Sequence, residues 1–332
     1  MTKKLGSIRD VAKETGLSIA TISRVMNGAT NVSPETREKV LLASKKLHYL
    51  PNPAARTLST KKSKIIAAII PTIEHSVYAK FIAGMEQTLA KQGYSLVFAI
   101  SNSDETQEKE AAEKLLGMGA EAFVFSGGRH DPELIELLKR RGVQFVYTSI
   151  WAPKSDIPSI GYDNFELARG AIEYLHKNGH QNIAVVHGPE ELSDRTVWRK
   201  RGAKSAEGPG VNLSFFEEEL SVGGGKIAAT SMLEHKTKFT AVLCLSDVMA
   251  LGAYTAFSEH NLVVPDDISV MGFDNLDWSV HISPPLTTID LPARIMGQAA
   301  VTSLMDYLEE KKPITSKFFE AKIIERASVK KL

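Results

Sequence analysis

The stretch SIRDVAKETGLSIATISRVMNGATNVSPETREKV, residues 7–40, decides how the chain begins to fold. Its apolar residues recur at helical spacing in three short groups, which small and turn-forming residues separate. Ser7, Ser18 and Ser33 each stand directly before one group, where a serine side chain caps the first turn of a helix. Pro34 suits the first helical position of the third group. Two short helices joined by a glycine-containing turn, with a third helix to close the core, predict a helix-turn-helix unit.

The same spacing divides the side chains of this unit into a core and a surface. In a helix-turn-helix protein, the N-terminal part of the second helix enters the major groove of DNA. The residues expected in the core include Ile22, Val25, Met26, Val40, Leu41 and Leu47. The residues that the second helix leaves for other faces are Ile19, Ala20, Thr21 and Arg24.

Charge is distributed unevenly along the 332 residues. Residues 1–63 hold 12 Lys or Arg and 4 Asp or Glu, a net +8, whereas the remaining 269 residues hold 28 and 35, a net −7. This separation favours a polyanion-binding head on a mildly acidic body. A three-helix unit for protein contacts is the alternative, and the positive charge counts against it.

The segment IRDVAKETGLSIATISRVMNG…VSPETREKVLLASKKLHYLPNPAARTL, residues 8–58, resembles the DNA-binding head and hinge of the LacI/GalR family of bacterial transcription regulators. The resemblance implies that Ile19, Ala20 and Arg24 read bases. Arg24 is able to form a bidentate contact with guanine, while the other two offer only apolar contact. Positions implied to meet phosphates or to support the turn are Ser18, Thr21, Ser23 and Asn27.

Residues 51–63 follow the expected head, residues 1–50, and carry the hinge. Pro53 suits the start of a helix, but Ala54 to Leu58 would form barely more than one turn, which is not stable alone. The resemblance implies that the hinge folds when two copies pair on operator DNA, with Ala55 and Leu58 in contact with the duplex. Leu58 would wedge into the minor groove. A plain flexible linker is the alternative.

From residue 64 onward, short apolar runs alternate with amphipathic helices, and this plan occurs twice. Such alternation predicts an α/β body of two doubly wound parallel-sheet lobes. The expected first lobe spans about 64–162 and 291–320, and the second about 163–290 and 321–332. The expected strands are 65–70, 95–100, 122–126, 145–150, 183–187, 215–220, 241–246 and 268–273, with helices that include 79–91, 106–117, 165–178, 250–260 and 293–310.

Ligands of such sheets bind beyond the carboxyl ends of the strands. Hydroxyl and carboxylate side chains dominate these ends, so a cleft between the lobes would suit a polyhydroxylated small molecule. The residues at these ends are Thr72, Ser101, Ser126 and Ser149 in the first lobe, and Gly188, Asp247 and Asp274 in the second.

The family resemblance continues more diffusely through GHQNIAVVHGP, AVLCLSDVMALGA, VPDDISVMGFDN and PPLTTI. It implies a fold like that of periplasmic sugar-binding proteins, with an effector in the cleft. Arg199, in RKRG, matches the effector-clamping arginine of the family, and Asp247 and Asp274 match polar cleft positions. His75 and Tyr78 stand at the lip of the first lobe, where the family more often has NPFF.

Several of these assignments have plain alternatives. Trp151 and Trp278 are candidate stacking faces for the effector or simple packing residues. Asp247 is also placed to cap the helix VMALGAYTAF. Arg199 would otherwise be a surface charge. The loop before Arg199 is one residue longer than in some relatives, which leaves the roles of Asp194 and Arg195 open.

The sequence lacks the motifs of phosphate loops, metal sites, cofactor sites and catalytic centres. VGGGKIA, residues 222–228, lacks the spacing of a phosphate loop and is interpreted as a loop before a helix. The nine histidines form no metal-binding pattern, no cofactor motif follows a strand, and no acid–base constellation indicates an enzyme. The single cysteine, Cys244, stands in an apolar run, and no stretch is apolar enough to span a membrane, so we expect a cytoplasmic protein.

The sequence therefore predicts a homodimeric transcriptional repressor that binds a pseudo-palindromic operator in double-stranded DNA under the control of a small-molecule effector. A sugar or sugar derivative is the expected effector, and a purine or another metabolite acting as a co-repressor is the alternative. The rival classes are an enzyme and a sugar-binding transport protein that use the same cleft.

Overall fold

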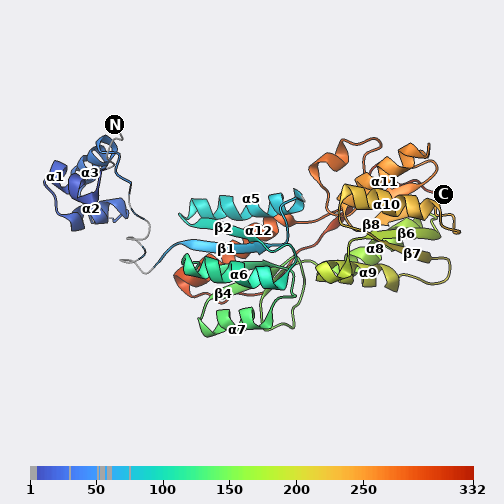
Figure 1. Ribbon diagram of the computed structural model, residues 1–332, viewed down its shortest axis with the longest axis horizontal. Coiled ribbons are helices and arrows are strands. Elements are labelled where there is room, and N and C mark those ends of the chain that lie inside the picture. Colours follow the sequence, from blue (N-terminus) through green and yellow to red (C-terminus); the bar gives the residue numbers. More distant parts are fainter. Residues whose placement is uncertain (1–5, 30, 51, 53–56, 58–61, 75) are drawn as a thin grey trace. The chain divides into compact units, whose positions relative to one another are not determined.

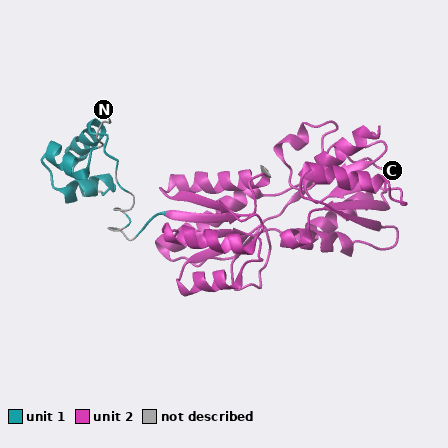
Figure 2. Cartoon of the chain, in the orientation of Figure 1, with its two compact units in different colours: residues 1–64 teal, residues 65–332 magenta. Residues whose placement is uncertain are grey.

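The computed structural model describes residues 6–29, 31–50, 52, 57, 62–74 and 76–332. The chain divides into two compact units, Met1–Lys64 and Ile65–Leu332 (Figure 2). Each unit has its own hydrophobic core among these residues.

The first unit consists of α1 (Ile8–Thr15), α2 (Ile19–Met26) and α3 (Pro34–Lys46). All three predicted N-caps are confirmed, since the side chains of Ser7, Ser18 and Ser33 accept hydrogen bonds from the backbone of the first turn. The predicted core is confirmed at Ile22, Val25 and Val40. Leu41 was predicted to face inward, but it is 50% exposed because α3 turns it away from the other two helices.

The first lobe of the second unit contains a parallel six-stranded sheet with the order β11-β5-β4-β3-β1-β2. The strands are β1 (Ile65–Ile70), β2 (Ser95–Ile100), β3 (Ala122–Ser126), β4 (Gln144–Thr148), β5 (Ser159–Gly161) and β11 (Lys317–Phe318). The helices are α5 (Ser76–Lys91), α6 (Glu105–Gly117), α7 (Pro132–Arg140) and α12 (Ala293–Glu310), and helices cover both faces of the sheet (Figure 1). The continuous apolar run of β1 is buried almost throughout, as expected for a covered parallel sheet.

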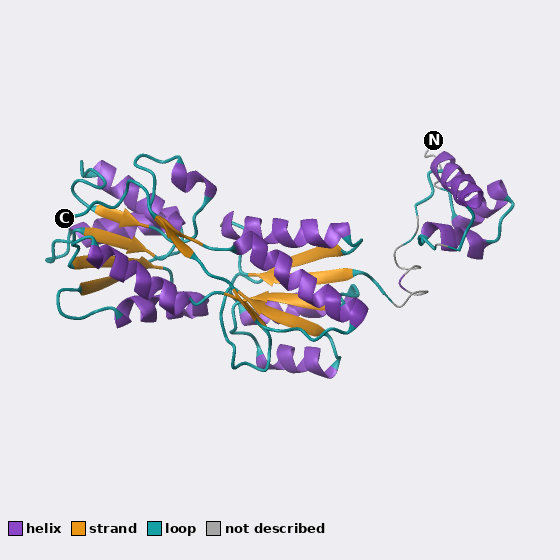
Figure 3. Cartoon of the chain, turned by 180° about the vertical axis from the view of Figure 1, so that it is seen from behind, coloured by secondary structure: helices purple, strands orange, loops and turns teal. Residues whose placement is uncertain are grey.

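The second lobe contains a parallel four-stranded sheet with the order β7-β6-β8-β9, again between helices (Figure 3). Its strands are β6 (Asn182–His187), β7 (Asn212–Glu217), β8 (Ala241–Cys244) and β9 (Ser269–Met271). Its helices are α8 (Asn164–Lys177), α9 (Asp194–Ser205), α10 (Val222–Leu233) and α11 (Asp247–Glu259), with the short turns η1 (Glu190–Leu192) and η2 (Asp277–Val280). The predicted fold class of two doubly wound parallel-sheet lobes is confirmed, but the segment 222–228 forms the start of α10 and is not a loop.

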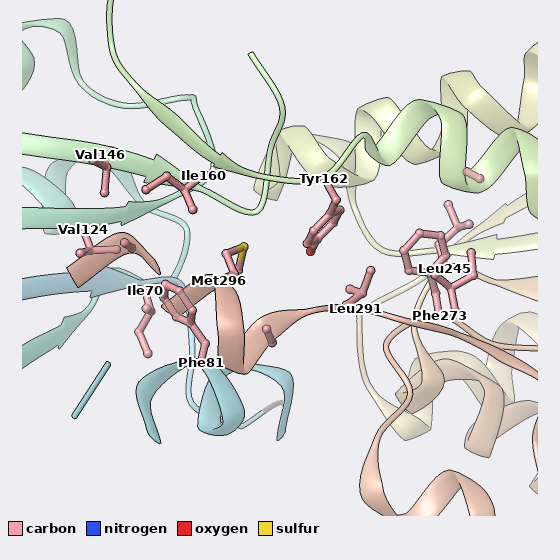
Figure 4. Packing of buried hydrophobic residues seen from close by; sticks show 14 of the residues in the cluster. Ile70, Phe81, Val124, Val146, Ile160, Tyr162, Leu245, Phe273, Leu291 and Met296 are labelled. Carbon is pink, nitrogen blue, oxygen red and sulfur yellow. The ribbon is translucent and has the colours of Figure 1, made fainter. Parts of the chain in front are cut away.

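The chain passes between the lobes more than once. After β5 it enters the second lobe at α8, and after β10 (Thr288–Asp290) it returns to the first lobe as α12. It then adds β11 to the edge of the large sheet, and β12 (Lys322–Ile324) pairs antiparallel with β10. One hydrophobic cluster runs through this junction, where Figure 4 shows Tyr162, Leu291 and Met296 between the packed side chains of the two lobes.

Candidate functional site

The exposed face of α2 holds the residues predicted to meet DNA. Ile19, Ala20 and Arg24 are exposed, while Ile22 and Val25 of the same helix are buried in the core. Among the residues that the structure describes, no hydrogen bond or ion pair engages the Arg24 guanidinium. Its donors are therefore available to a base edge.

The polar residues around α2 bond largely to one another. Ser18 Oγ lies 2.9 Å from Thr21 Oγ1 and accepts a hydrogen bond from the Thr21 N–H at 3.1 Å. Asn27 Nδ2 donates to Ser23 Oγ at 3.3 Å. These contacts fix both ends of the helix, which suits the supporting role implied for these positions. Ala55 and Leu58 lie outside the described residues.

A cavity of about 300 Å³ lies between the two lobes of the second unit. This volume is at the small end of the usual range for ligand sites, roughly 300–1,000 Å³. The polar or aromatic residues that line it include Thr72, Glu74, Tyr78, Phe81, Asn102, Ser103, Ser149, Tyr162, Ser193, Arg195, Arg199, Glu219, Ser246 and Asp274. Of the predicted effector residues, the structure therefore brings Tyr78, Arg199 and Asp274 together.

Arg199 is held in the cavity wall by contacts on several sides. Its Nε donates to Asn164 Oδ1 at 2.9 Å, and its Nη1 donates to the Leu245 carbonyl oxygen at 2.8 Å. Its Cζ stands 3.9 Å from the centroid of the Phe273 ring, and its Nη1 lies 3.8 Å from Asp274 Oδ1. Only 9% of the residue is exposed, so it is not the surface charge considered as its alternative. These contacts hold the planar guanidinium in one orientation before any ligand arrives.

Asp274 lies beside this guanidinium. Its Oδ2 accepts a hydrogen bond from Ser246 Oγ at 2.8 Å. Burial, opposed by the Arg199 charge and reinforced by the nearby Asp247 carboxylate, raises the pKa of Asp274 to about 7. Its backbone has a φ of 134°, a strained conformation for a residue other than glycine, and its N–H donates to the Ile289 carbonyl at 3.0 Å. At neutral pH this carboxyl is therefore able both to donate and to accept hydrogen bonds.

The structure places Asp247 outside the cavity wall. It is the first residue of α11, and Ser246 is the N-cap. Its two carboxylate oxygens accept hydrogen bonds from the Leu276 N–H at 2.8 Å and from Thr288 Oγ1 at 2.6 Å. Burial raises the pKa of Asp247, and these hydrogen bonds oppose the rise. Asp247 therefore has a structural role in place of the predicted effector contact. Its carboxylate joins the start of α11 to the segment after Asp274.

Neither predicted tryptophan lines the cavity. Trp151 packs edge-on against Phe318, with ring centroids 5.3 Å apart, and Trp278 packs against the core of the second lobe. The aromatic faces in the wall belong to Tyr78, Phe81 and Tyr162. Burial raises the pKa of Tyr162, so its hydroxyl stays protonated and is able to donate.

Ser126 and Ser101 line a smaller polar pocket of about 30 Å³ beside the main cavity. That volume holds about one water molecule. Ser126 Oγ is buried and has no hydrogen-bond partner in the described part of the chain. His75, predicted at the lip, lies outside the described residues.

Arg195 and Tyr162 line the cavity although the predicted set did not include them. Arg195 stands four residues before Arg199, so the two side chains share one face of α9. That spacing was the signal that could have identified Arg195. Tyr162 follows β5, a three-residue strand too short to be recognised from its sequence.

A helix-turn-helix head joined to a two-lobed body with an internal cavity defines a DNA-binding regulator with a small-molecule site. The family model described as "Bacterial regulatory proteins, lacI family" matches residues 7–52, and a periplasmic binding protein-like domain matches residues 172–329. Catabolite control protein A of Priestia megaterium is 34% identical over 92% of this chain and 93% of its own length. The chain belongs to the LacI family of bacterial transcription regulators, not to the enzymes or transport proteins considered as alternatives.

The comparison with solved structures also finds LacI family regulators. A lac repressor dimer bound to operator and to the anti-inducer ONPF is 28% identical, with a TM-score of 0.86 over 98% of this chain and 100% of that chain. A LacI family regulator from Enterococcus faecium with bound ribose is 27% identical, with a TM-score of 0.73 over 81% and 99%. Among the described residues, no helix has the length and apolar character needed to cross a membrane, and no cluster of His, Cys, Asp or Glu is suited to a metal ion.

Proposed function

We propose that this protein is a homodimeric repressor whose grip on its operator is controlled by a small molecule bound between the lobes. Residues 1–50 read DNA, residues 51–63 act as the hinge, and residues 64–332 bind the effector and the second subunit. The observation that carries the proposal is the buried Arg199–Asp274 pair in a cavity of about 300 Å³, in a chain that also exposes Arg24 on a helix-turn-helix. A protein of this kind acts on the chromosome, in the cytoplasm.

The effector we infer is a neutral, polyhydroxylated molecule, either a sugar or a sugar derivative. Both arginines of the wall already have carboxylate partners, Asp194 at 2.8 Å from Arg195 and Asp274 at 3.8 Å from Arg199. A strongly anionic ligand would have to displace them. Hydroxyl groups, in contrast, pair with neutral and charged donors alike, and the aromatic side chains offer flat faces. The ribose bound by the Enterococcus faecium relative is consistent with this class.

A thermal-shift screen with monosaccharides, disaccharides, nucleosides and nucleobases tests the effector class. We expect a sugar or sugar derivative to raise the melting temperature, because a ligand that binds only the folded state stabilises it by about 2.7 kcal/mol at a hundred times its Kd. Nucleobases should produce no shift. A shift from a purine alone would overturn the sugar assignment and leave the regulator assignment intact.

The dimer we propose involves the exposed edge of the first lobe. β2 is the last strand of its sheet, and its Phe98 and Ile100 are 42% and 37% exposed. Exposed apolar side chains on an unpaired edge strand promote association, so we expect a second subunit to bury them. A two-fold dimer presents two heads, and therefore requires an operator with two-fold symmetry.

Operator binding should depend steeply on salt. Residues 1–63 carry a net charge of +8, so we expect log K to fall linearly with log salt concentration, with a slope of about −0.9 for each phosphate contacted. A gel-shift series across salt concentrations with duplex DNA measures that slope. Absence of binding at low ionic strength, with and without the ligand found by thermal shift, would refute the DNA-binding role.

A further inference from the structure

The two lobes touch directly where the turn after β3 meets the start of α9. The Gly128 N–H donates to Asp194 Oδ2 at 2.7 Å, and Arg195 Nη1 donates to the Ser126 carbonyl oxygen at 3.1 Å. The same Nη1 lies 2.8 Å from Asp194 Oδ1. We propose that Asp194 and Arg195 are positioning residues that latch α9 to the residue 126–128 turn, and that this latch holds the two lobes in one arrangement. These four residues, Ser126, Gly128, Asp194 and Arg195, are called the latch below.

At Gly127 the turn approaches α9 so closely that a side chain would meet the Arg195 guanidinium. A Cβ on Gly127 would lie 2.1 Å from Arg195 Nη1, and the φ of +96° at this residue also disfavours any other amino acid. A Cβ on Gly128 would lie 2.7 Å from Ile150 Cδ1 of the same lobe and 3.5 Å from Asp194 Oδ2, an ordinary contact distance. The backbone of one lobe thus approaches the charged side chains of the other without an intervening group.

The turn is held rigid from within the first lobe. His130 Nε2 lies 3.1 Å from the Gly127 carbonyl oxygen, and His130 Nδ1 lies 2.9 Å from Glu108 Oε2. The imidazole packs between the rings of Phe125 and Tyr147, at centroid distances of 4.9 and 4.7 Å. The buried His130–Glu108 pair therefore restricts the movement of the turn. Because the turn is fixed to the first lobe in this way, its contacts with α9 resist displacement of that helix.

Arg195 also faces the effector cavity. It lines both the main cavity and the small polar pocket, and it belongs to the same helix face as Arg199. A ligand that accepts a hydrogen bond from Arg195 would compete with the Ser126 carbonyl for one guanidinium. Occupancy of the cavity would then bias the arrangement of the lobes, as differential affinity requires. This last step rests on the proposed function, whereas the latch itself does not.

A second bridge joins the lobes through other elements. Lys80 Nζ on α5 donates to the Asn275 carbonyl oxygen at 2.8 Å and pairs with Asp277 Oδ1 at 2.8 Å. α5 and α9 are drawn on opposite edges of the body in Figure 1. Loss of the latch should therefore leave the lobes attached at the Lys80 bridge and at the crossing segments, but free to move apart at α9.

Electron–electron distance measurements on the full-length, ligand-free protein test the latch. Met118 and Val263, exposed residues of the first and second lobes, are replaced by cysteine and spin-labelled, while buried Cys244 stays unlabelled. We expect Asp194→Ala, and Gly127→Ala, whose Cβ would displace the Arg195 guanidinium, to broaden the distance distribution and to add a population displaced from the wild-type peak. Asp194→Asn, which keeps an acceptor for Gly128 but loses the charge beside Arg195, should give a smaller change.

Glu133→Gln is the matched control. Glu133 is an acidic residue in the first turn of α7, on the surface of the first lobe. Among the described residues its carboxylate pairs only with Lys109, so the distance distribution of Glu133→Gln should equal that of the wild type. Circular dichroism establishes whether each variant is folded. If Asp194→Ala does not fold, Asp194→Asn tests the latch in its place. A distribution unchanged in every folded latch variant would overturn the proposal. Because neither DNA nor effector is present, that outcome would say nothing against the regulator assignment.

Discussion

Replacing Arg24 with alanine should weaken binding to the operator roughly ten- to a hundredfold. A bidentate arginine–guanine contact contributes about 1–3 kcal/mol of discrimination against the wrong base, and every 1.4 kcal/mol is a factor of ten in affinity. Ile19 and Ala20, the other two positions predicted to read bases, offer no hydrogen bonds from their side chains. Gel shifts with an operator selected from random duplexes, and with the same duplex lacking its guanine, measure the effect.

The pattern of loss distinguishes base reading from general charge attraction. Arg24→Ala should lose affinity for the selected operator and bind the altered duplex about as well as the wild type does. Lys45→Ala, which removes an exposed cation from α3, should weaken binding to both duplexes by the same small factor. If Arg24→Ala weakened both duplexes equally, Arg24 would be a phosphate contact, and base recognition would lie elsewhere in the chain.

The head was predictable because its signals are local. Each helix begins with a serine that satisfies a backbone N–H of its own first turn, and these bonds form within four residues of sequence. The error at Leu41 arose because α3 has three adjacent apolar residues, Val40, Leu41 and Leu42. Helical spacing lets such a run fit more than one face, and only packing against α1 and α2 decides which side chain is buried.

The α10 segment shows where local signals fail. Three consecutive glycines disfavour a helix, yet Val222–Leu233 is helical and packs closely against α11. A Cβ on Gly225 would lie 2.2 Å from the Met249 carbonyl oxygen, and one on Gly252 would lie 2.1 Å from that of Val222. Glycine is required by a neighbour that is distant in sequence, which no pattern within the segment reveals.

The cavity was predictable only in part, for the same reason. The rule that ligands bind beyond the carboxyl ends of strands placed Thr72, Ser149, Gly188 and Asp274 in the wall correctly. It also nominated Asp247, whose carboxylate is instead occupied by Leu276 and Thr288. Which of several strand-end side chains faces the cavity depends on backbone conformation, such as the positive φ of Asp274, and this is set by tertiary contacts.

Replacing Arg199 with alanine should abolish effector binding and lower the free energy of unfolding of the body by about 3–5 kcal/mol, the usual cost of removing one partner of a buried ion pair. The Leu245 carbonyl would lose its donor and Asp274 its cation. All three tryptophans, Trp151, Trp198 and Trp278, belong to the second unit, so urea unfolding followed by tryptophan fluorescence reports on the body alone. Thermal shift with the ligand from the screen measures the loss of binding.

The destabilisation should also depend on pH, with a sign that follows from Asp274. Burial raises the folded-state pKa of Asp274 above its ordinary value, so the stability contributed by its protonated form is fully present below about pH 3.8 and declines as pH rises toward about 7. Without the Arg199 charge, which opposes this rise, the folded pKa moves higher and the decline continues above pH 7. The penalty of Arg199→Ala should therefore be larger at about pH 8 than at about pH 6.

A second substitution identifies the carboxyl as the cause. In R199A/D274N no charge remains at position 274, so the additional loss between about pH 6 and about pH 8 should disappear, and part of the stability at the higher pH should return. Asp274 is 7% exposed and its nearest described cation is Arg199, which is why the two substitutions must be read as a pair. A penalty of equal size at both pH values would contradict this explanation. The loss of stability would then come from the contacts of Arg199 with the Leu245 carbonyl, the Asn164 amide and the Phe273 ring, and Asp274 would be hydrated once the arginine is removed.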